Sequence, residues 1–518
     1  MRKQLTKIAD TLQSALIGAI IVGAALAFGG AVWWARIVLG ALIVLLALTA
    51  LVSGALRGRF ELISSPTAAI GLLVLGLAAF QLVPLPARLA ERLAPRARQA
   101  YALGMLTDLA HQDDPAYQAP EMGDIRTPIS LDRSATLRWL GGAIGALVVF
   151  WVSAHHADRL RHTAVIWGAV VAALFIGTAF GTIQLLGGTE GAYGAFAVGN
   201  APFWGPSLAD WAEAPNRAHL QFLLDASGSR TSWTAAMPGH SWVVAGWPGG
   251  PGAFLALGSL ALPLALGLTL QLCHARGSRE PLWDRLRASN RTGVAVLLVV
   301  MTLASVILFG AFSGRWLALP LALGLLLVGA GAAWPAGHRK PALGLTGLFV
   351  CGLAGGIVLG DVFGRPEGTS PLTEAGGWSE ARSQWLDASR IAQDFPMLGS
   401  GMGSYAVISP YYKHTDASFT TANSTLLQWW AESGTCGVAL VGIAGVIALL
   451  RLPSAVRLVG SADRALAFGL IGAMMSFACF AAVHWTVELG VVGLAVAAVA
   501  GTAERWLAGG TDLFIEAI

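Results

Sequence analysis

Charged residues are scarce in this sequence, where they make up 12% of 518 residues. Soluble globular proteins carry about 25% charged residues, so this deficit argues against a soluble fold. The formal net charge is +4, and no long basic tract is interleaved with aromatic residues. Nucleic acid is therefore not an expected partner. No group of residues has the spacing of metal ligands, and we predict neither a metal nor another cofactor.

Cysteine is also rare, with four residues and no Cys-x-x-Cys motif. All four lie in or at the ends of apolar runs. We therefore expect reduced, buried packing residues and no disulfide framework. They are Cys273, Cys351, Cys436 and Cys479.

Hydrophobic residues, in contrast, make up 55% of the chain, and the mean hydropathy is +0.65. They form runs of roughly 17–25 residues, the length at which a helix spans a bilayer. The sequence thus predicts an all-α polytopic membrane protein with about twelve transmembrane helices. The first run is followed at once by another span, which is atypical of a cleaved signal peptide. The expected spans are 12–30, 35–55, 65–84, 137–153, 163–184, 252–273, 292–311, 316–334, 342–361, 434–450, 465–483 and 488–507.

Lysine and arginine gather in the loops on one side of these spans. Arg2 and Lys3 precede the first span, and Arg57 follows the second. The short loops on the other side nearly lack both residue types. The positive-inside rule places the basic side and both termini in the cytoplasm, which predicts a multi-pass membrane protein. Three long segments then face outward, namely 85–136, 185–251 and 362–433.

We divide the chain into two membrane regions. Residues 1–128 hold three spans and an outward loop, and residues 129–518 hold the other spans. The 185–251 loop is rich in tryptophan and carries polar residues such as Arg217 and His219. Flat aromatic faces beside polar groups suit sugar rings. Alternatively, this loop is a cap that rests on lipid headgroups.

A polar segment at 378–437 separates two long apolar runs. Its first part, 378–393, has apolar residues at helical spacing and predicts an amphipathic helix at the membrane surface. Pro396 ends that helix, and the three glycines within 399–403 predict a tight turn with close backbone approach. Residues 423–437 then lead into the next span. A connection between spans needs only a few residues, so a long patterned one indicates function.

Three arginines lie where a phosphate group of a membrane lipid would be. Arg315 sits at the outer end of the eighth span, after a very short turn at 310–314, and presents a planar fork of donors. Its alternative role is a snorkelling anchor. Arg382 and Arg390 are about two turns apart on the loop helix. They either grip a pyrophosphate or form the solvated face of that helix.

Other ionisable residues lie near the same membrane boundary. Glu432 precedes the tenth span, where it either orients a donor or caps the helix start. His414 lies in the middle of the polar segment, as a solvated residue or as a general base. His484 and Glu488 occupy the turn between the last two spans, a place where such groups are often functional but are also tolerated.

Four stretches of the chain, in order, resemble one family. The first three are ISLDRSATLRWL (129–140), FSGRW (312–316) and RSQWLDASRIAQDFPMLGSGMGSY (382–405). The fourth, NSTLLQWWAESGTCG (423–437), is similar to the motif His-[Asn/Ser/Gln]-x9-Gly-x-x-Gly, with Ser424 at its second position. Together they resemble the O-antigen ligase family, which includes related polysaccharide polymerases and protein O-oligosaccharyltransferases. The resemblance covers most of the chain from about residue 129 onward and includes the arrangement of about twelve spans.

The resemblance implies an enzyme of cell-surface polysaccharide assembly in the bacterial inner membrane, with its long loops in the periplasm. Such an enzyme takes a glycan from an undecaprenyl-pyrophosphate donor to a hydroxyl on lipid A core, on a glycan repeat or on a protein, and needs no metal. Its pyrophosphate would rest on Arg315, Arg382 and Arg390. Its glycan would contact Trp385, Ser424, Arg217 and His219.

The sequence departs from the family pattern at Asn423, which stands on the motif His. The resemblance assigns that His the role of base for the acceptor hydroxyl. An amide does not accept such a proton, and losing a general base costs about 10²–10⁴ in rate. His414, His219 and His240 are candidates for the missing role, and Glu432 is a further candidate catalytic residue. The family's Asn-Arg-Asn-His stretch is also replaced, by GGPGAF at 249–254.

Two other function classes remain open. The first is a non-catalytic membrane protein that binds a lipid-linked glycan or a partner of the polysaccharide machinery, which Asn423 favours. The second is a transporter. Transporters typically carry ionisable residues in mid-span or paired broken helices, whereas the charged residues of the predicted spans lie near the span ends.

Overall fold

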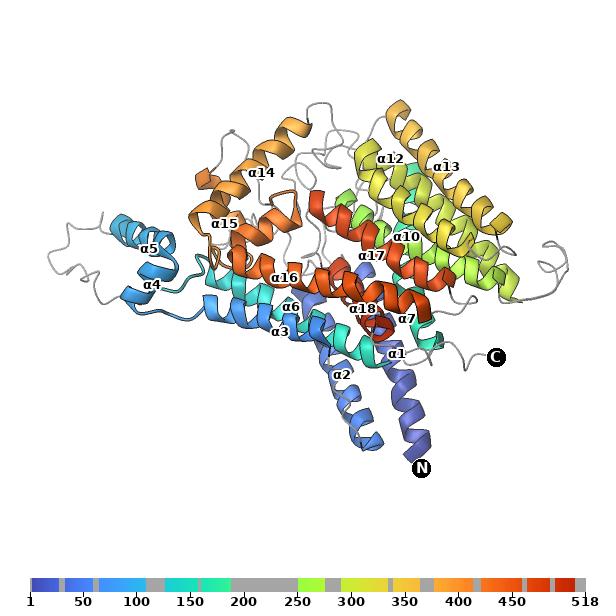
Figure 1. Ribbon diagram of the computed structural model, residues 1–518, viewed down its shortest axis with the longest axis horizontal. Coiled ribbons are helices and arrows are strands. Elements are labelled where there is room, and N and C mark those ends of the chain that lie inside the picture. Colours follow the sequence, from blue (N-terminus) through green and yellow to red (C-terminus); the bar gives the residue numbers. More distant parts are fainter. Residues whose placement is uncertain are drawn as a thin grey trace.

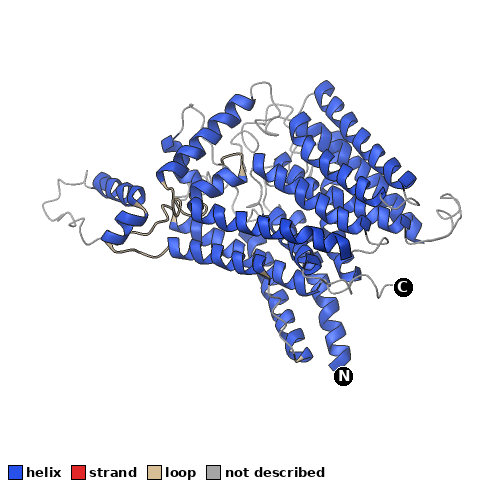
Figure 2. Ribbon diagram, viewed as in Figure 1, coloured by secondary structure: helices blue, strands red, loops and turns tan. Residues whose placement is uncertain are grey.

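The computed structural model describes residues 2–27, 33–58, 65–108, 126–156, 160–187, 250–274, 290–333, 339–363, 377–412, 421–458, 464–484 and 490–507. Their regular structure is helical apart from one isolated β-bridge between Leu85 and Thr127 (Figure 1 and Figure 2). The helices are α1 (Arg2–Leu26), α2 (Trp33–Arg57), α3 (Pro66–Gln81), α4 (Ala87–Leu93), α5 (Pro95–Asp108), α6 (Arg133–His156), α7 (Leu160–Gly187), α10 (Gly250–His274), α12 (Asn290–Ala333), α13 (Arg339–Phe363), α14 (Gly377–Asp394), α15 (Tyr405–Tyr412), α16 (Thr425–Leu458), α17 (Arg464–Val483) and α18 (Gly490–Leu507).

The prediction of an all-α polytopic membrane protein is confirmed. Within the described ranges, 11 segments are long and apolar enough to cross a membrane, and two of them belong to α12. The span predicted at 65–84 corresponds to α3, an apolar helix of 16 residues. At 1.5 Å per residue, α3 covers about 24 Å, less than the roughly 30 Å thickness of a hydrocarbon core.

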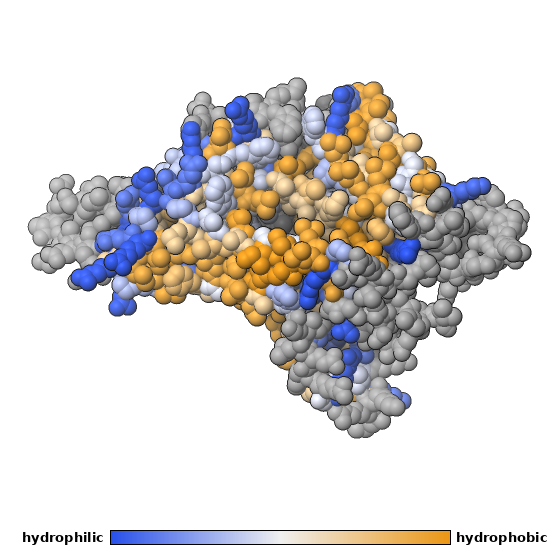
Figure 3. Space-filling view, in the orientation of Figure 1, coloured by the Kyte–Doolittle hydropathy of each residue, from blue (hydrophilic) through white to orange (hydrophobic). Residues whose placement is uncertain are grey.

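The bundle is built around α10. In its apolar 18-residue stretch, 94% of the residues are buried, whereas in the corresponding stretch of α16 only 6% are buried. The helix packs against α7, α12 and α17 in the main hydrophobic core. In contrast, α16 runs along the periphery, where apolar surface extends over α16 and over α12 and α13 (Figure 3). Apolar side chains exposed on so many helices indicate a lipid-facing surface.

The two spans within α12, Gly293–Ser313 and Arg315–Ala333, run in opposite directions. Contacts with α13 show this, because they pair Leu303 with Gly352, Ile307 with Gly356, Ala311 with Gly360, Arg315 with Asp361 and Gly329 with Thr346. In the first three pairs, the residue numbers of α12 and α13 rise together, so these segments are parallel. In the last two, the number in α13 falls as that in α12 rises, so these segments are antiparallel. A straight helix would also put Leu303 and Gly329 about 39 Å apart. The chain therefore reverses between Ala311 and Arg315, which confirms the turn predicted at 310–314.

Local capping explains two helix starts next to the polar segment. Ser65 accepts a hydrogen bond from the Ala68 N–H, with Pro66 at the first helical position of α3. Asp132 accepts a hydrogen bond at 2.9 Å from the N–H of Ala135 and so caps α6. The Asp of the ISLDRSATLRWL stretch thus fixes the point at which the chain enters a span.

A second, smaller hydrophobic core lies at one end of the bundle. It joins α4, α5, α14, α15 and the start of α16, and these helices gather at that end in Figure 1. Its members are Leu85, Ala90, Ala94, Ala97, Ile129, Ala388, Ile391, Phe395, Tyr405, Ile408, Ala422 and Ala431. Hydrophilic surface covers α4, α5 and α14 beside the apolar surface of α3 and α16 (Figure 3). The polar segment predicted at 378–437 therefore folds on its own core at the border of the apolar surface.

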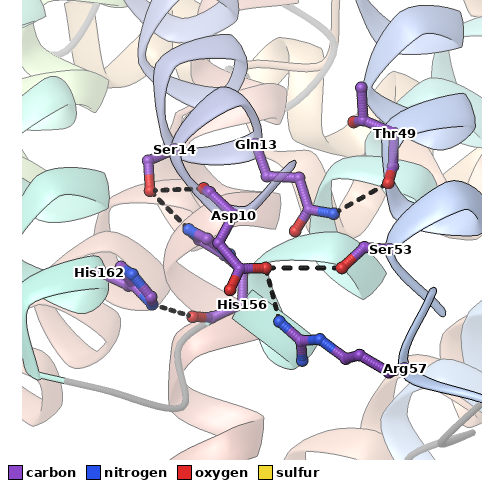
Figure 4. Close-up of polar contacts among 8 residues, drawn as sticks. All are labelled: Asp10, Gln13, Ser14, Thr49, Ser53, Arg57, His156 and His162. Carbon is purple, nitrogen blue, oxygen red and sulfur yellow. Dashed lines mark hydrogen bonds and ion pairs between the residues drawn. The ribbon is translucent and has the colours of Figure 1, made fainter. Parts of the chain in front are cut away.

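A polar cluster joins α1, α2, α6 and α7 (Figure 4). Asp10 of α1 forms an ion pair with Arg57 at the end of α2. Ser14 shares a hydrogen bond with His156, whose ring stacks on that of His162 with centroids 4.2 Å apart. These contacts tie the first two helices to the bundle at the ends that carry the basic loops.

The prediction of buried cysteines is wrong for three of the four residues. Cys351, Cys436 and Cys479 are free thiols, and all three are exposed on the surface of the chain. The side chain of Cys273 lies outside the described residues. Cys351, Cys436 and Cys479 belong to apolar helices, where the outer face meets lipid in a membrane, so an apolar residue need not point inward.

Candidate functional site

The glycine turn after α14 makes the close approaches that its sequence predicts. Gly399, Gly401 and Gly403 have φ values of 71°, 112° and 77°, in a region that favours glycine. A Cβ on Gly401 would lie 2.7 Å from the Cα of Ser130. A Cβ on Gly399 would collide with the backbone of Glu432. The turn is therefore packed between the residues just before α6 and the first turns of α16.

The carboxylate of Glu432 holds this turn from α16. One oxygen accepts a hydrogen bond at 2.9 Å from the N–H of Gly403, and the other accepts one at 3.1 Å from the N–H of Tyr405. The amide of Gln428 donates a third hydrogen bond at 3.3 Å. Glu432 is completely buried.

The cap predicted for Glu432 exists, but the prediction named the wrong helix. We expected Glu432 to cap the helix that follows it. Instead, α16 begins earlier, at Thr425, and the carboxylate binds the N-terminal N–H groups of α15. The first N–H groups of a helix have no partner within it, so an acceptor oxygen is favoured there. Because its oxygens accept three hydrogen bonds, Glu432 fixes the glycine turn and the start of α15 against α16.

Gln81, at the end of α3, completes the turn from a third direction. Its side-chain N–H₂ donates to the carbonyls of Leu398 at 2.6 Å and Glu432 at 2.9 Å. Its side-chain oxygen accepts a hydrogen bond at 3.0 Å from the N–H of Met402. Our sequence reasoning missed this residue. The available signal was a single amide at the end of an apolar run.

The 129–140 stretch packs on the same turn. The Thr136 hydroxyl donates to the Met402 carbonyl at 2.8 Å and shares a 2.8 Å hydrogen bond with the Ser130 hydroxyl. The N–H of Leu131 donates to the Ser400 carbonyl at 2.9 Å. We name this assembly the turn site: Gln81, Ser130, Thr136, residues 395–404 and Glu432. Three of the four stretches that carry the family resemblance meet in it.

Asn423 joins α14 to the start of α16. Its side-chain amide donates to the Gln384 oxygen at 2.6 Å, and its carbonyl accepts a 3.3 Å hydrogen bond from the indole of Trp385. Its φ of 46° is left-handed, a conformation that asparagine tolerates better than most residues. The side chain at the position of the family's His thus serves to hold α14.

Ser424 acts as a helix cap. Its hydroxyl accepts a hydrogen bond from the N–H of Leu427 at 3.3 Å and donates to the Ala482 carbonyl at 2.7 Å. The neighbouring Thr425 hydroxyl donates to the His484 carbonyl at 3.0 Å. These bonds fasten the start of α16 to the end of α17. The predicted contact of Ser424 with a glycan stays a prediction.

The three predicted phosphate-binding arginines are exposed but lie on different elements. Arg382 and Arg390 are on the outer face of α14, opposite its buried side. Arg315 begins the second span of α12 and pairs with Asp361 of α13 at 3.3 Å. Their side chains are 79% and 37% exposed, so the pair contributes little to stability. Arg315 is therefore accessible to an anion that competes with Asp361.

Asp394, at the end of α14, links α5 and α15. It accepts a 2.6 Å hydrogen bond from the hydroxyl of Tyr412 and lies 3.6 Å from Arg96. Burial, together with the hydrogen bond to Asp394, raises the pKa of Tyr412. Burial also raises the pKa of Tyr405, which lies beside the turn. Both phenols are therefore neutral near pH 7.

The chain matches no protein-family model, no curated protein and no solved structure. In the part of the chain that the structure describes, no group of three or more His, Cys, Asp and Glu residues is placed to hold a metal ion. His414, Arg217 and His219 lie outside the described residues. Within the described residues, the candidate functional site therefore consists of the turn site, Asn423 with Trp385, and the exposed arginines.

Proposed function

We propose that this chain is an inner-membrane glycosyltransferase. It moves a glycan from an undecaprenyl-pyrophosphate donor to a hydroxyl of lipid A core, of a glycan repeat or of a protein. The observation that carries the proposal is the turn site. Stretches 129–140, 382–405 and 423–437, each similar to the O-antigen ligase family, meet there in one hydrogen-bonded unit.

The position of that unit suits an amphiphilic donor. The helices around the turn site present a hydrophilic surface beside an apolar one (Figure 3). A polyprenyl tail would lie against the apolar surface, and its pyrophosphate would lie at the border, within reach of an exposed arginine on α14. The rigid glycine turn would then hold α14 in a fixed orientation.

The reaction itself sets what the arginines must do. The acceptor oxygen forms a bond to the anomeric carbon, and the bond from that carbon to the pyrophosphate oxygen breaks. The electron pair leaves with undecaprenyl pyrophosphate, and the proton of the hydroxyl passes to a base. Guanidinium groups that contact the pyrophosphate stabilise the charge that develops on it. No step in this scheme requires a metal.

The test is a transfer assay in nanodiscs with a lipid-pyrophosphate glycan donor and a mixed set of acceptors. The wild type should release undecaprenyl pyrophosphate together with a glycosylated product. Arg382→Ala and Arg315→Ala should each lower that rate by about 10²–10³. Arg88→Ala, an exposed arginine on α4, serves as the matched control and should transfer normally. Wild-type transfer by the Arg315 and Arg382 variants would remove these residues from the mechanism.

The second candidate is a non-catalytic protein that binds the lipid-linked glycan or a partner of the polysaccharide machinery. It is favoured by Asn423, whose amide is bound to Gln384 and offers no base. The same assay separates the two functions. Tight donor binding without release of undecaprenyl pyrophosphate would support the binding protein.

A further inference from the structure

The proposed transfer leaves one role without a residue, the acceptance of the hydroxyl proton. Asn423 is an amide, and its N–H₂ group donates to Gln384. Glu432 is completely buried and accepts three hydrogen bonds. Neither residue is therefore placed to take a proton from an incoming acceptor. A hydroxyl nucleophile still needs a base within hydrogen-bond reach, directly or through one water.

His484 lies directly beside the Asn423 segment. Its backbone carbonyl accepts the hydrogen bond of the Thr425 hydroxyl at 3.0 Å, two residues after Asn423. Two residues earlier, the Ala482 carbonyl accepts a hydrogen bond from the Ser424 hydroxyl at 2.7 Å. These two bonds fix the end of α17 against the start of α16. Since the indole of Trp385 bonds Asn423, α14 meets the same place from the other side.

The imidazole of His484 sits in a shaped niche at the start of α10. Its ring stacks on Phe480, with centroids 5.1 Å apart and planes inclined by 23°. A Cβ added to Gly252 would lie 2.7 Å from its Cε1 atom and 3.2 Å from its Nε2 atom. A larger residue at position 252 would therefore force the ring to shift. The residue is 9% exposed, so a small part of it remains accessible.

The helix end adds an electrostatic reason. α17 ends at Val483, so His484 follows the last helical residue. The C-terminal end of a helix carries partial negative charge, which stabilises a positive ring there. A proton that arrives on this imidazole is thus held by the dipole of α17.

We infer that His484 is the proton acceptor of the proposed transfer reaction, an inference that rests on that proposed function. The acceptor hydroxyl gives its proton to the imidazole as its oxygen bonds the anomeric carbon. The imidazolium later returns the proton to solvent. The acceptor substrate is accordingly one that carries a neutral hydroxyl group. That hydroxyl would approach His484 where the end of α17 meets the starts of α10 and α16.

The experiment compares wild type, His484→Gln and His155→Gln in the nanodisc assay, across a pH series. His155 is the matched control, a histidine on α6 whose ring bonds the Trp151 carbonyl. His484→Gln should lose about 10²–10⁴ in turnover and keep its donor affinity. Wild type and His155→Gln should slow at acidic pH, because a protonated imidazole cannot accept the proton of the hydroxyl. Any activity left in His484→Gln should lack that acidic limb.

Each result decides a separate question. A folded His484→Gln protein with wild-type turnover and an unchanged pH profile would overturn the role of His484 and leave the transferase intact. If that variant does not fold, His484→Asn takes its place, and wild-type turnover with an unchanged pH profile in that variant overturns the role of His484 in the same way. Donor binding by wild type without transfer to any acceptor would instead refute the transferase itself, and His484 with it.

Discussion

Glu432 and Gly403 lie 29 residues apart, yet the carboxylate of Glu432 accepts a 2.9 Å hydrogen bond from the N–H of Gly403. This contact ties the helix that enters the membrane to the turn that leaves α14. Gly403 adopts a left-handed φ of 77°, a conformation that favours glycine. The glycine and the glutamate therefore form one structural unit.

Replacing Glu432 should destabilise the protein. Glu432→Ala leaves the N–H groups of Gly403 and Tyr405 buried without a partner, at about 1–3 kcal/mol for each group. Glu432→Gln keeps one accepting oxygen, so its stability should lie between that of the wild type and that of Glu432→Ala. Thermal unfolding in detergent measures the difference. Glu91→Ala is the control, since Glu91 is exposed in its pair with Arg98 and should change little. A Glu432→Ala protein as stable as wild type, but inactive, would contradict the structural role.

Asn423→His introduces the histidine of the O-antigen ligase motif that this segment resembles, and tests the base assignment. Histidine also tolerates a left-handed backbone, so the φ of 46° should not prevent folding. If His484 already accepts the proton, transfer should change little. The nanodisc assay measures the rate. A gain of about 10² or more would show that the base had been missing, and would contradict the role of His484.

Gly356→Ala and Gly355→Ala form a matched pair on α13. A Cβ on Gly356 would collide with the Ile307 carbonyl, whereas a Cβ on Gly355 meets nothing within 4 Å. We expect Gly356→Ala to lower stability by about 1–3 kcal/mol, the usual cost of overpacking. Gly355→Ala should be neutral. Thermal unfolding of both variants measures this. Equal stability would mean that the parallel packing of α13 on the first half of α12 is wrong.

Tyr412 should make the second, smaller hydrophobic core sensitive to alkaline pH. The folded protein raises the pKa of this phenol, through burial and its hydrogen bond to Asp394, because the neutral hydroxyl donates that bond. The contribution to stability is fully present below the unfolded pKa of about 10 and is lost as pH rises through the folded value. Unfolding measured from pH 8 upward should show this loss. Tyr412→Phe should be less stable at pH 8 and should show a weaker pH dependence. An identical loss in the variant would assign it to another group.

Much of the fold follows from the sequence alone. Runs of apolar residues determine membrane helices because backbone groups in lipid must bond within the segment. The helix at 378–393 falls within α14, and Pro396 follows its end by two residues. The turn glycines were also predictable, because a series of glycines after a helix indicates left-handed backbone. These features depend on residues close together in the chain.

Other features required the tertiary structure. Nothing near Gln81 in the sequence indicates that its amide binds Leu398, Met402 and Glu432. Glu432 was predictable as a helix cap, but only the packing of α16 on the turn decided which helix it caps. The place of His484 beside Asn423 likewise depends on how α17 meets α16.

The sequence by itself thus determined that this is a polytopic helical membrane protein and where most of its apolar helices lie. The tertiary structure decided which polar groups meet. The physical reason is that hydrophobic periodicity and turn chemistry act over a few residues, whereas a buried hydrogen bond can join residues hundreds of positions apart. Gln81 and Glu432 are separated by 351 residues, and only the packed bundle brings them to 2.9 Å.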